Sequence, residues 1–446
     1  MKSGMMKQYL QDGATLKKCH IATMLQSAKG AHRLSFHTPG HKLGTEDITE
    51  LSFSDNLSCP KGCILEAEKD IAEILGANKS FILTDGSTSG ILSMLYAIKS
   101  LGATKIAFPE TSHKSVWNGC VLLGLTAYVL SAETEGNIPL PPTRYALNEK
   151  NKAYCLEADA LLFTSPDYYG NVCDLQALRD FCDKEKKWLL IDGAHGGHLH
   201  FDATLHAGSV ADMWVDGVHK SLPAFTQGAV VSAKTPILAE KLQEAVEIFR
   251  TTSPSYPIMA SVEYALKYPE NLRLQWAVRA FRNARAPKGR IYPSEDWTKL
   301  CAVFGEHAFE VDKLLQKKGI FSEFCDGNVI MFYLSPATKL SDFSKLSQCL
   351  LKLFNAYPLP TNAEKTDENG VDKAAVQTAN FEKIEWVELD EAEYRICASN
   401  CGLFPPCTPI LLVGERIEKE KLALLKKADN VYGLRDGKIC VFVEES

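Results

Sequence analysis

The feature that most constrains the fold is a series of seven short apolar segments, with helical patterns between several of them. The segments are SFILT (80–84), KIAF (105–108), TAYVLS (126–131), ALLFTSP (160–166), WLLID (188–192), MWVDG (213–217) and GAVVS (228–232). Apolar residues recur with helical spacing at 64–75, 91–101, 174–186 and 236–249. Short apolar strands that alternate with helices are typical of α/β proteins with a mostly parallel sheet covered on both faces. Because such sheets bind ligands beyond the carboxyl ends of their strands, the polar residues after each strand are the candidate functional residues.

The pattern changes near residue 270, which suggests a second domain. Longer charged helices are expected at 270–285, 295–318 and 338–356, with strands near 328–334, 383–389, 409–413 and 438–444. A chain of 446 residues is long enough for about three domains, or for two of which one is enlarged. We predict an N-terminal arm at 1–35, a large domain at 36–290 and a smaller C-terminal α+β domain at 291–446.

Composition narrows the cellular setting and the class of partner. The 49 Lys and Arg against 55 Asp and Glu give a formal charge of -6, which argues against binding nucleic acid. The 14 cysteines include no C-x-x-C, and we interpret them as reduced thiols of a cytoplasmic protein. No signal peptide is apparent. The uncharged stretch at 115–132 is long enough to span a membrane, but its pattern favours a buried helix followed by a strand.

The motif Asp85-Gly86-Ser87-Thr88-Ser89-Gly90 follows one strand and opens a helix. Backbone N–H groups, hydroxyls and a helix N-terminus together suit a phosphate. The motif is neither a Walker loop nor a dinucleotide fingerprint. An ordinary capped turn explains the same residues, so this motif alone leaves the choice open.

Asp192 ends the strand WLLID and is followed by His195, His198 and His200. A carboxylate that leaves an apolar strand requires a partner if it is buried. A zinc site, solvated histidines, and a cofactor contact by Asp192 and His195 are three readings of this segment. The glycine-rich spacing does not place the three rings on one face, and we expect no metal.

Lys220 is the only charged residue between Asp216 and Lys234 if histidines are taken as neutral. Partial desolvation favours the neutral amine, the form needed by a Schiff-base lysine, although a lysine reaching solvent from a turn explains the segment equally well. His113 follows another strand and by itself reads as structural. Taken together, Ser87, Thr88, Lys220, Asp192 and His113 offer a phosphate site, a lysine, an acid and a stacking ring. Pyridoxal phosphate needs these four groups.

Eight motifs in this order resemble the bacterial ornithine/lysine/arginine decarboxylase family, in a short form without an N-terminal wing domain. They are FHTPGHK (36–42), DGSTSG (85–90), ETSHKS (110–115), SPDYYG (165–170), DGAHGGH (192–198), HKSLPAFTQGA (219–229), TSPSYPIMAS (252–261) and FPPCTPILLVGE (404–415). The resemblance covers nearly the whole chain. It implies the aspartate aminotransferase-like fold (fold type I) of pyridoxal-phosphate enzymes.

The resemblance also assigns roles to individual residues. Lys220 would hold the cofactor aldehyde, Asp192 would pair with the pyridine nitrogen, and His195 would lie nearby. Gly86, Ser87, Thr88 and His219 would surround the phosphate, while His113 and Ala194 would lie on the two faces of the ring. Thr252 and Ser253 resemble residues that such homodimers supply from the neighbouring subunit. Asp85 and Asp167 are sequence candidates for binding the distal cation of the substrate.

The sequence departs from the family pattern at several positions. Gly217 stands where a serine is usual, and Asp85 where asparagine is common. Asp167 precedes the Tyr-Tyr-Gly motif, and the C-terminal motifs differ at Tyr394, Ser399 and Cys407. A serine at 217 would donate a hydrogen bond to the phosphate. We therefore expect Gly217→Ser to tighten cofactor binding, provided that the glycine is not required by the backbone.

The resemblance implies decarboxylation of arginine, lysine or ornithine to the amine and CO₂, a reaction of polyamine metabolism. Another pyridoxal-phosphate reaction, such as transamination, is a second reading, because the fold supports many chemistries. A non-catalytic homologue with a binding or regulatory role is a third. The intact Lys220 and Asp192 argue against that last reading.

Overall fold

The computed structural model describes residues 19–29, 34, 36–42, 46–131, 133–135, 138–140, 149–359, 383–403, 409–427 and 430–443. These residues form two compact units. The first unit comprises the described parts of Met1–Ala97, Ser165–Arg179 and Leu189–Asn362. The second comprises those of Ile98–Thr164, Asp180–Trp188 and Ala363–Ser446.

The seven apolar segments are the seven strands of the largest sheet. They form β1 (Lys79–Leu83), β2 (Lys105–Pro109), β3 (Thr126–Leu130), β6 (Ala160–Thr164), β7 (Trp188–Gly193), β8 (Met213–Asp216) and β9 (Ala229–Ala233), in the order β1-β9-β8-β7-β6-β2-β3. The pairs β2–β3, β2–β6 and β7–β8 are parallel, whereas β9 runs antiparallel to β1 and β8. The prediction of a mostly parallel sheet is confirmed.

In the first unit, local sequence signals set the ends of the helices. The unit contains α2 (His20–Lys29), α3 (Cys63–Leu75), most of α4 (Ser87–Ser100), α8 (Val218–Ser221), α9 (Pro236–Phe249) and α10 (Tyr256–Leu266). Gly76 adopts φ +65° and ends α3. At α9, the Thr235 hydroxyl accepts a hydrogen bond from the Leu238 N–H, and Pro236 occupies the first turn. The helix predicted at 236–249 is therefore confirmed.

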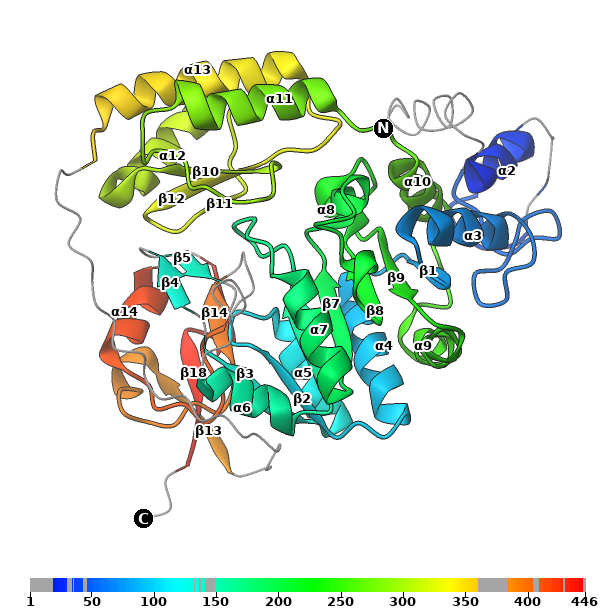
Figure 1. Cartoon of the computed structure of the whole chain (residues 1–446), viewed down its shortest axis with the longest axis horizontal. Helices are drawn as coiled ribbons and strands as arrows, with labels where there is room; N and C mark the ends of the chain where they lie inside the picture. Colours follow the sequence, from blue (N-terminus) through cyan, green and yellow to red (C-terminus); the bar gives the residue numbers. More distant parts are fainter. Residues whose placement is uncertain are drawn as a thin grey trace. The chain divides into compact units, whose positions relative to one another are not determined.

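A smaller three-stranded sheet, in the order β10-β12-β11, also belongs to the first unit. It consists of β10 (Lys299–Val303), β11 (Phe324–Cys325) and β12 (Val329–Tyr333). In Figure 1, α11 (Leu272–Ala280) and α13 (Leu340–Ala356) lie side by side over one face of this sheet. Their apolar residues form a core with alternate residues of β10 and β12.

The helix predicted at 295–318 is wrong in its first half. Residues 299–303 form β10, and α12 spans only Ala308–Lys317. The charged residues Asp296 and Lys299 suggested a solvated helix face, but both are fully buried and bonded to each other. The segment therefore carries a buried ion pair next to a strand, where the charge pattern indicated an exposed helix.

The C-terminal residues of the second unit form two small antiparallel sheets. One contains β13 (Ile384–Glu388), β17 (Leu434–Arg435) and β18 (Lys438–Phe442). The other contains β14 (Cys401–Leu403), β15 (Pro409–Leu411) and β16 (Val431–Tyr432), and α14 (Lys419–Lys427) packs in the same core. The unit also includes β4 (Glu133–Glu135), β5 (Ile138–Leu140), α5 (Lys114–Leu123) and α6 (Glu149–Glu157).

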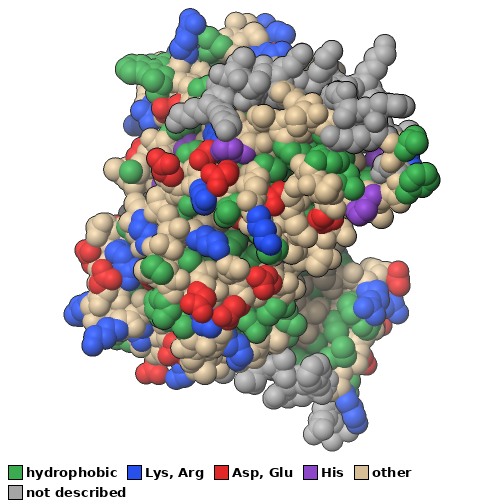
Figure 2. Space-filling view, turned by 90° about the vertical axis from the view of Figure 1, so that its right-hand side faces the viewer, with side chains coloured by type: hydrophobic (Ala, Val, Ile, Leu, Met, Phe, Trp, Pro, Cys, Tyr) green, Lys and Arg blue, Asp and Glu red, His purple; other side chains and the backbone are tan. Residues whose placement is uncertain are grey.

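The domain boundaries predicted from sequence stay a prediction, although the boundary at 290 falls inside the first unit. Most of the predicted arm lies outside the described residues, as do Cys407 and the other residues of 404–408. No helix in the described part of the chain is long and apolar enough to cross a membrane. On the face in Figure 2, basic and acidic side chains are interspersed.

Candidate functional site

Lys220 lies in the short helix α8, directly after β8 ends. The backbone N–H of Lys220 donates to the Gly217 carbonyl, which closes the turn that follows the strand. The Lys220 side chain is half-buried, and its Nζ lies 3.1 Å from Nε2 of His195. His195 follows the neighbouring strand β7 and is 7% exposed. The two residues predicted from separate motifs therefore meet at the carboxyl ends of adjacent strands.

Asp192 lies at the end of β7 and is 1% exposed. Its Oδ1 accepts a hydrogen bond of 3.1 Å from the Ala194 N–H, and its Oδ2 makes no hydrogen bond within the described residues. Burial raises the pKa of Asp192, the positive charge of Lys220 opposes this, and the buried Asp216 on β8 adds to it. Asp192 is thus a desolvated carboxylate with one oxygen available to a ring N–H.

Gly217 is required by close packing, which corrects the expectation that a serine would fit there. A Cβ placed on Gly217 would lie 2.3 Å from the Ala194 carbonyl oxygen and 3.3 Å from the Ala194 Cα. The φ of Gly217 is -81°, so the backbone angle itself is ordinary. The obstacle is the backbone of residue 194, which side-chain rotation cannot relieve. A serine could not reach the phosphate from this position without moving that backbone.

The motif at 85–90 forms the N-terminus of α4. Gly86 adopts φ +84°, and its N–H donates to the Gln227 carbonyl. Ser87 is half-buried and Thr88 is exposed, so both hydroxyls are accessible at a helix end whose first N–H groups lack helical partners. His219 uses Nδ1 for the Gly228 carbonyl at 2.9 Å, which leaves Nε2 as its second polar atom. Burial lowers the pKa of His219, and this hydrogen bond opposes the shift.

Asp85 connects the start of this motif with the segment after α9. Its Oδ1 accepts from the Ser89 hydroxyl at 2.7 Å, and its Oδ2 accepts from the Thr251 N–H at 3.1 Å. Thr252 and Ser253 follow and are exposed, and the Ser253 N–H donates to the Thr251 hydroxyl. Two of the predicted motifs are therefore joined within one chain, and residues 252 and 253 present side chains to the surface.

Asp167 has both carboxylate oxygens engaged in its own loop. Oδ1 accepts from the N–H groups of Tyr169 and Asn171, each at 2.9 Å, and Oδ2 accepts from the Asn171 side chain at 2.8 Å. Burial raises the pKa of Asp167 to about 6 although these bonds oppose the shift. We therefore leave Asp167 out of the proposed substrate contacts, because its geometry gives it the role of holding the loop.

His113 belongs to the second unit, where it caps α5. Its Nδ1 accepts from the Ser115 N–H at 3.2 Å and lies 2.7 Å from the Ser115 hydroxyl. The side chain is half-buried. The cap fixes the ring direction at the start of the helix, and the stacking role predicted for His113 stays a prediction.

Sequence reasoning missed a buried polar cluster beside Lys220. Asp296 is fully buried, and its two oxygens contact His198 Nε2 at 2.9 Å and Lys299 Nζ at 3.0 Å. The hydroxyl of Tyr333 lies 3.3 Å from Nδ1 of His195. A fully buried lysine is rare and requires a charged or polar partner. The burial of Lys299 would therefore have indicated this cluster, but burial at this position cannot be read from the sequence.

The donor set in the first unit fits pyridoxal phosphate. Asp192 offers a buried carboxylate oxygen, Lys220 offers an amine, and the N-terminus of α4 offers hydroxyl and N–H donors. Such an arrangement can hold a dianion at one end and a protonated heterocycle at the other.

Comparison of the sequence with known families identifies the chain. Residues 40–291 match the Orn/Lys/Arg decarboxylase major domain, and residues 363–431 match the C-terminal domain of the same family. The chain belongs to the Orn/Lys/Arg decarboxylase family. The resemblance noted in the eight motifs is thereby confirmed, and this decarboxylase has the fold of fold type I pyridoxal-phosphate enzymes.

Individual relatives cover nearly the whole chain of this decarboxylase. An arginine decarboxylase of Bacillus subtilis (strain 168) is 25% identical over 460 residues, covering 91% of this chain and 93% of the relative. An uncharacterized protein of the same organism is 27% identical over 463 residues, covering 92% and 96%. The lysine decarboxylase LdcF of Francisella novicida aligns with a TM-score of 0.73 at 17% identity, covering 96% of this chain and 81% of that one. This last likeness concerns the fold.

Proposed function

We propose that this protein decarboxylates a basic amino acid (arginine, lysine or ornithine) with pyridoxal 5'-phosphate held covalently by Lys220. The observation that carries the proposal is the placement of a half-buried lysine amine and a buried carboxylate at the carboxyl ends of adjacent parallel strands. Membership in the decarboxylase family supports the reaction type.

Each residue of the site has a role that follows from its surroundings. When bound, the cofactor supplies an electron-accepting ring for the electron pair left by CO₂. Asp192 keeps a proton on the ring nitrogen through its available oxygen, and the low dielectric around it strengthens that bond. Gly86, Ser87, Thr88 and His219 hold the phosphate. The family resemblance assigns His113 and Ala194 to the two faces of the ring.

The substrate amine and carboxylate are common to all amino acids, so selectivity rests on a partner for the distal cation. Asp85 remains the candidate carboxylate, because it is half-buried and accepts two hydrogen bonds from protein donors, whereas Asp167 accepts three. Relatives named arginine and lysine decarboxylases support a cationic substrate without choosing between them.

We also infer a homodimer whose sites take Thr252 and Ser253 from the partner. The exposure of these residues after α9 is consistent with this arrangement. Sedimentation of the wild type and of Thr252→Ala with Ser253→Ala tests it. A dimer with weakened cofactor binding in the double variant is expected, and a fully active monomer would exclude it.

Borohydride reduction and product analysis test the main proposal. Protein incubated with pyridoxal phosphate and reduced should carry the cofactor on Lys220, as mapped by peptide mass spectrometry. Incubation with arginine, lysine, ornithine and a panel of other amino acids should release CO₂ and one amine. Label on another lysine would refute the cofactor assignment. A keto acid product would indicate transamination instead.

A further inference from the structure

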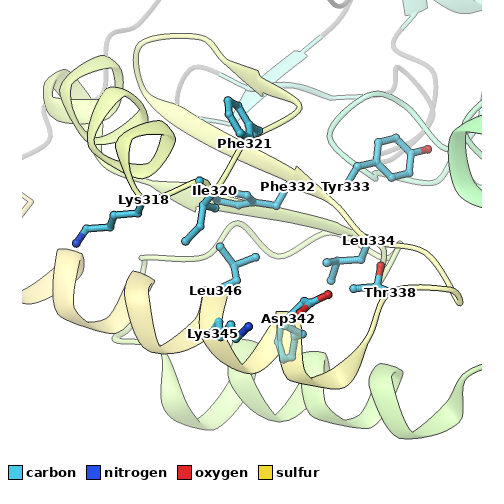
Figure 3. Close-up of a pocket in the computed structure, with 12 residues that line it drawn as sticks. Lys318, Ile320, Phe321, Phe332, Tyr333, Leu334, Thr338, Asp342, Lys345 and Leu346 are labelled. Atoms are coloured by element: carbon cyan, nitrogen blue, oxygen red, sulfur yellow. The ribbon is translucent and has the colours of Figure 1, made fainter. Parts of the chain in front are cut away.

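Strands β10 and β12 place Lys299 and Tyr333 on the face of their sheet opposite the apolar core. The two residues are partners in the antiparallel register. Their neighbours Leu300 and Phe332 point into the core with α11 and α13. Because side chains alternate along a strand, Lys299 and Tyr333 share the other face. Figure 3 shows the Tyr333 ring extending from β12 away from Leu346.

Lys299 is held on that face by contacts at both ends of its side chain. Its Nζ lies 3.0 Å from Asp296 Oδ2 and 3.6 Å from the centroid of the Tyr333 ring. Its aliphatic part packs on Gly170, where an added Cβ would approach within 2.8 Å of the Lys299 Cγ. Arg282 donates to the carbonyl oxygens of residues 294 and 296, which fixes the loop before β10. The ammonium therefore lies between the Asp296 carboxylate and the face of the tyrosine ring.

The Tyr333 hydroxyl contacts His195, which in turn contacts Lys220. It lies 3.3 Å from His195 Nδ1 and 3.3 Å from the His195 carbonyl oxygen. The two rings are near parallel, with an interplanar angle of 21°. The other ring nitrogen of His195 lies 3.1 Å from Lys220 Nζ. One imidazole thus joins the Tyr333 hydroxyl to the amine that reacts.

The position of the single proton on a neutral His195 ring determines whether His195 can hydrogen-bond the neutral amine or the ammonium of Lys220. If Tyr333 donates to Nδ1, Nε2 carries the proton and donates to a neutral amine. If Tyr333 donates to the carbonyl oxygen, Nδ1 can carry the proton, and Nε2 accepts from an ammonium. Burial raises the pKa of Tyr333 well above its usual value, so the hydroxyl retains its proton and can donate.

We propose that Tyr333 is a positioning residue that, held over the Lys299 ammonium, directs the proton of His195 to Nε2 and so favours the neutral amine of Lys220. This inference rests on the proposed function. The neutral amine condenses with an aldehyde: its nitrogen bonds to the carbonyl carbon, and the carbonyl oxygen leaves as water. The Lys299 charge acts in the same direction as Tyr333, because a nearby cation disfavours a second one.

The charged and titratable groups around this chain of contacts come from several elements. Asp192 on β7 and His219 on α8 interact electrostatically with Lys220, as does Lys299 on β10. Asp296, Tyr168 and Glu323 act on Tyr333. Asp192 favours the ammonium of Lys220, whereas Lys299 opposes it. Removing the Lys299 charge or the Tyr333 hydroxyl should therefore raise the pH at which the Lys220 ammonium loses its proton.

The pH dependence of cofactor capture tests this role. Full-length protein freed of cofactor is mixed with pyridoxal phosphate between pH 6 and 10, and the rate of covalent capture is followed by visible absorbance. In Tyr333→Phe the midpoint of the rate profile should rise by about one pH unit, which makes capture roughly tenfold slower at pH 7.5. Lys299→Met should shift the midpoint in the same direction.

Tyr292→Phe is the matched control, because it loses a buried hydroxyl bonded to Asn171 in the same unit but does not contact His195. Its profile should coincide with that of the wild type. If Lys299→Met does not fold, Tyr333→Phe alone decides. A Tyr333→Phe profile identical to the wild type would overturn the inference and leave the proposed function intact. A wild type that captures no cofactor on Lys220 would overturn both.

Discussion

The backbone carbonyl of Ala194 occupies the space into which a side chain at residue 217 would extend, since a Cβ on Gly217 would lie 2.3 Å from that oxygen. Such a contact forces the main chain to move at the carboxyl ends of β7 and β8, close to Asp192 and Lys220. The glycine is therefore part of the geometry of the site, and the missing hydroxyl is a consequence of that packing.

Gly217→Ala is expected to weaken cofactor binding by roughly tenfold or more and to lower the melting temperature, because overpacking costs about 1–3 kcal/mol. Titration with pyridoxal phosphate and thermal unfolding measure the two effects. Gly62→Ala is the control, because a Cβ there would make an ordinary contact of 3.5 Å with Asp55. Tighter binding of pyridoxal phosphate by Gly217→Ser would show that the backbone at Ala194 can move, and that the phosphate lacks a hydrogen-bond donor in the wild type.

Asp192→Asn should retain the fold and lower kcat at least about a hundredfold, because an amide oxygen cannot hold the ring proton as a carboxylate does. The folded-state pKa of Asp192 is raised, so its ionised form destabilises the fold as pH rises above the unfolded value. Without cofactor, the variant should therefore be more stable than the wild type at pH 8. Kinetics and urea unfolding check both expectations, with Asp202→Asn in an exposed turn as control. Wild-type kcat in Asp192→Asn would refute the role.

Asp167→Ala should lower the free energy of unfolding by about 1–3 kcal/mol, because the N–H groups of Tyr169 and Asn171 lose their acceptor. Asp167→Asn keeps one acceptor oxygen and should lose less. Urea unfolding measures both. An unchanged stability with a raised KM for one amino acid would instead return Asp167 to the substrate site.

Glu68→Gln should make the stability of the protein less dependent on pH between pH 5 and pH 8. Glu68 is 4% exposed and accepts a hydrogen bond from the Ile82 N–H, and burial raises its pKa to about 7 from an ordinary 4.5. The folded wild type therefore binds a proton that the unfolded chain releases, and its stability falls as pH rises from about 4.5 to about 7. The amide avoids this loss, which amounts to about 1–3 kcal/mol at pH 8.

Urea unfolding at pH 5 and pH 8 measures this difference. Glu73→Gln, an exposed position on the same helix, is the control. A stability difference between Glu68→Gln and the wild type that is the same at both pH values would contradict the assignment.

Local patterns were sufficient to predict the strands of the large sheet and the helix at 236–249, because apolar periodicity and capping residues act within one segment. The pairing of Lys220 with the His195 segment could be anticipated, since both follow parallel strands. The cluster of His198, Asp296, Lys299 and Tyr333 could not. Its members lie up to 135 positions apart, from His198 to Tyr333, and charge at 295–299 favoured an exposed helix. The obstruction at Gly217 likewise exists only once β7 and β8 are adjacent.

The register that sets Lys299 opposite Tyr333 limits how the gene can be cut or recombined. The family's major-domain match ends at residue 291, before either residue. A chimera that joins this major domain to a foreign C-terminal half would inherit Lys220 and His195 but would lose the strands that support them. We expect such a chimera to show the same raised midpoint of cofactor capture as Lys299→Met, and a chimera joined beyond residue 359 to keep the wild-type profile.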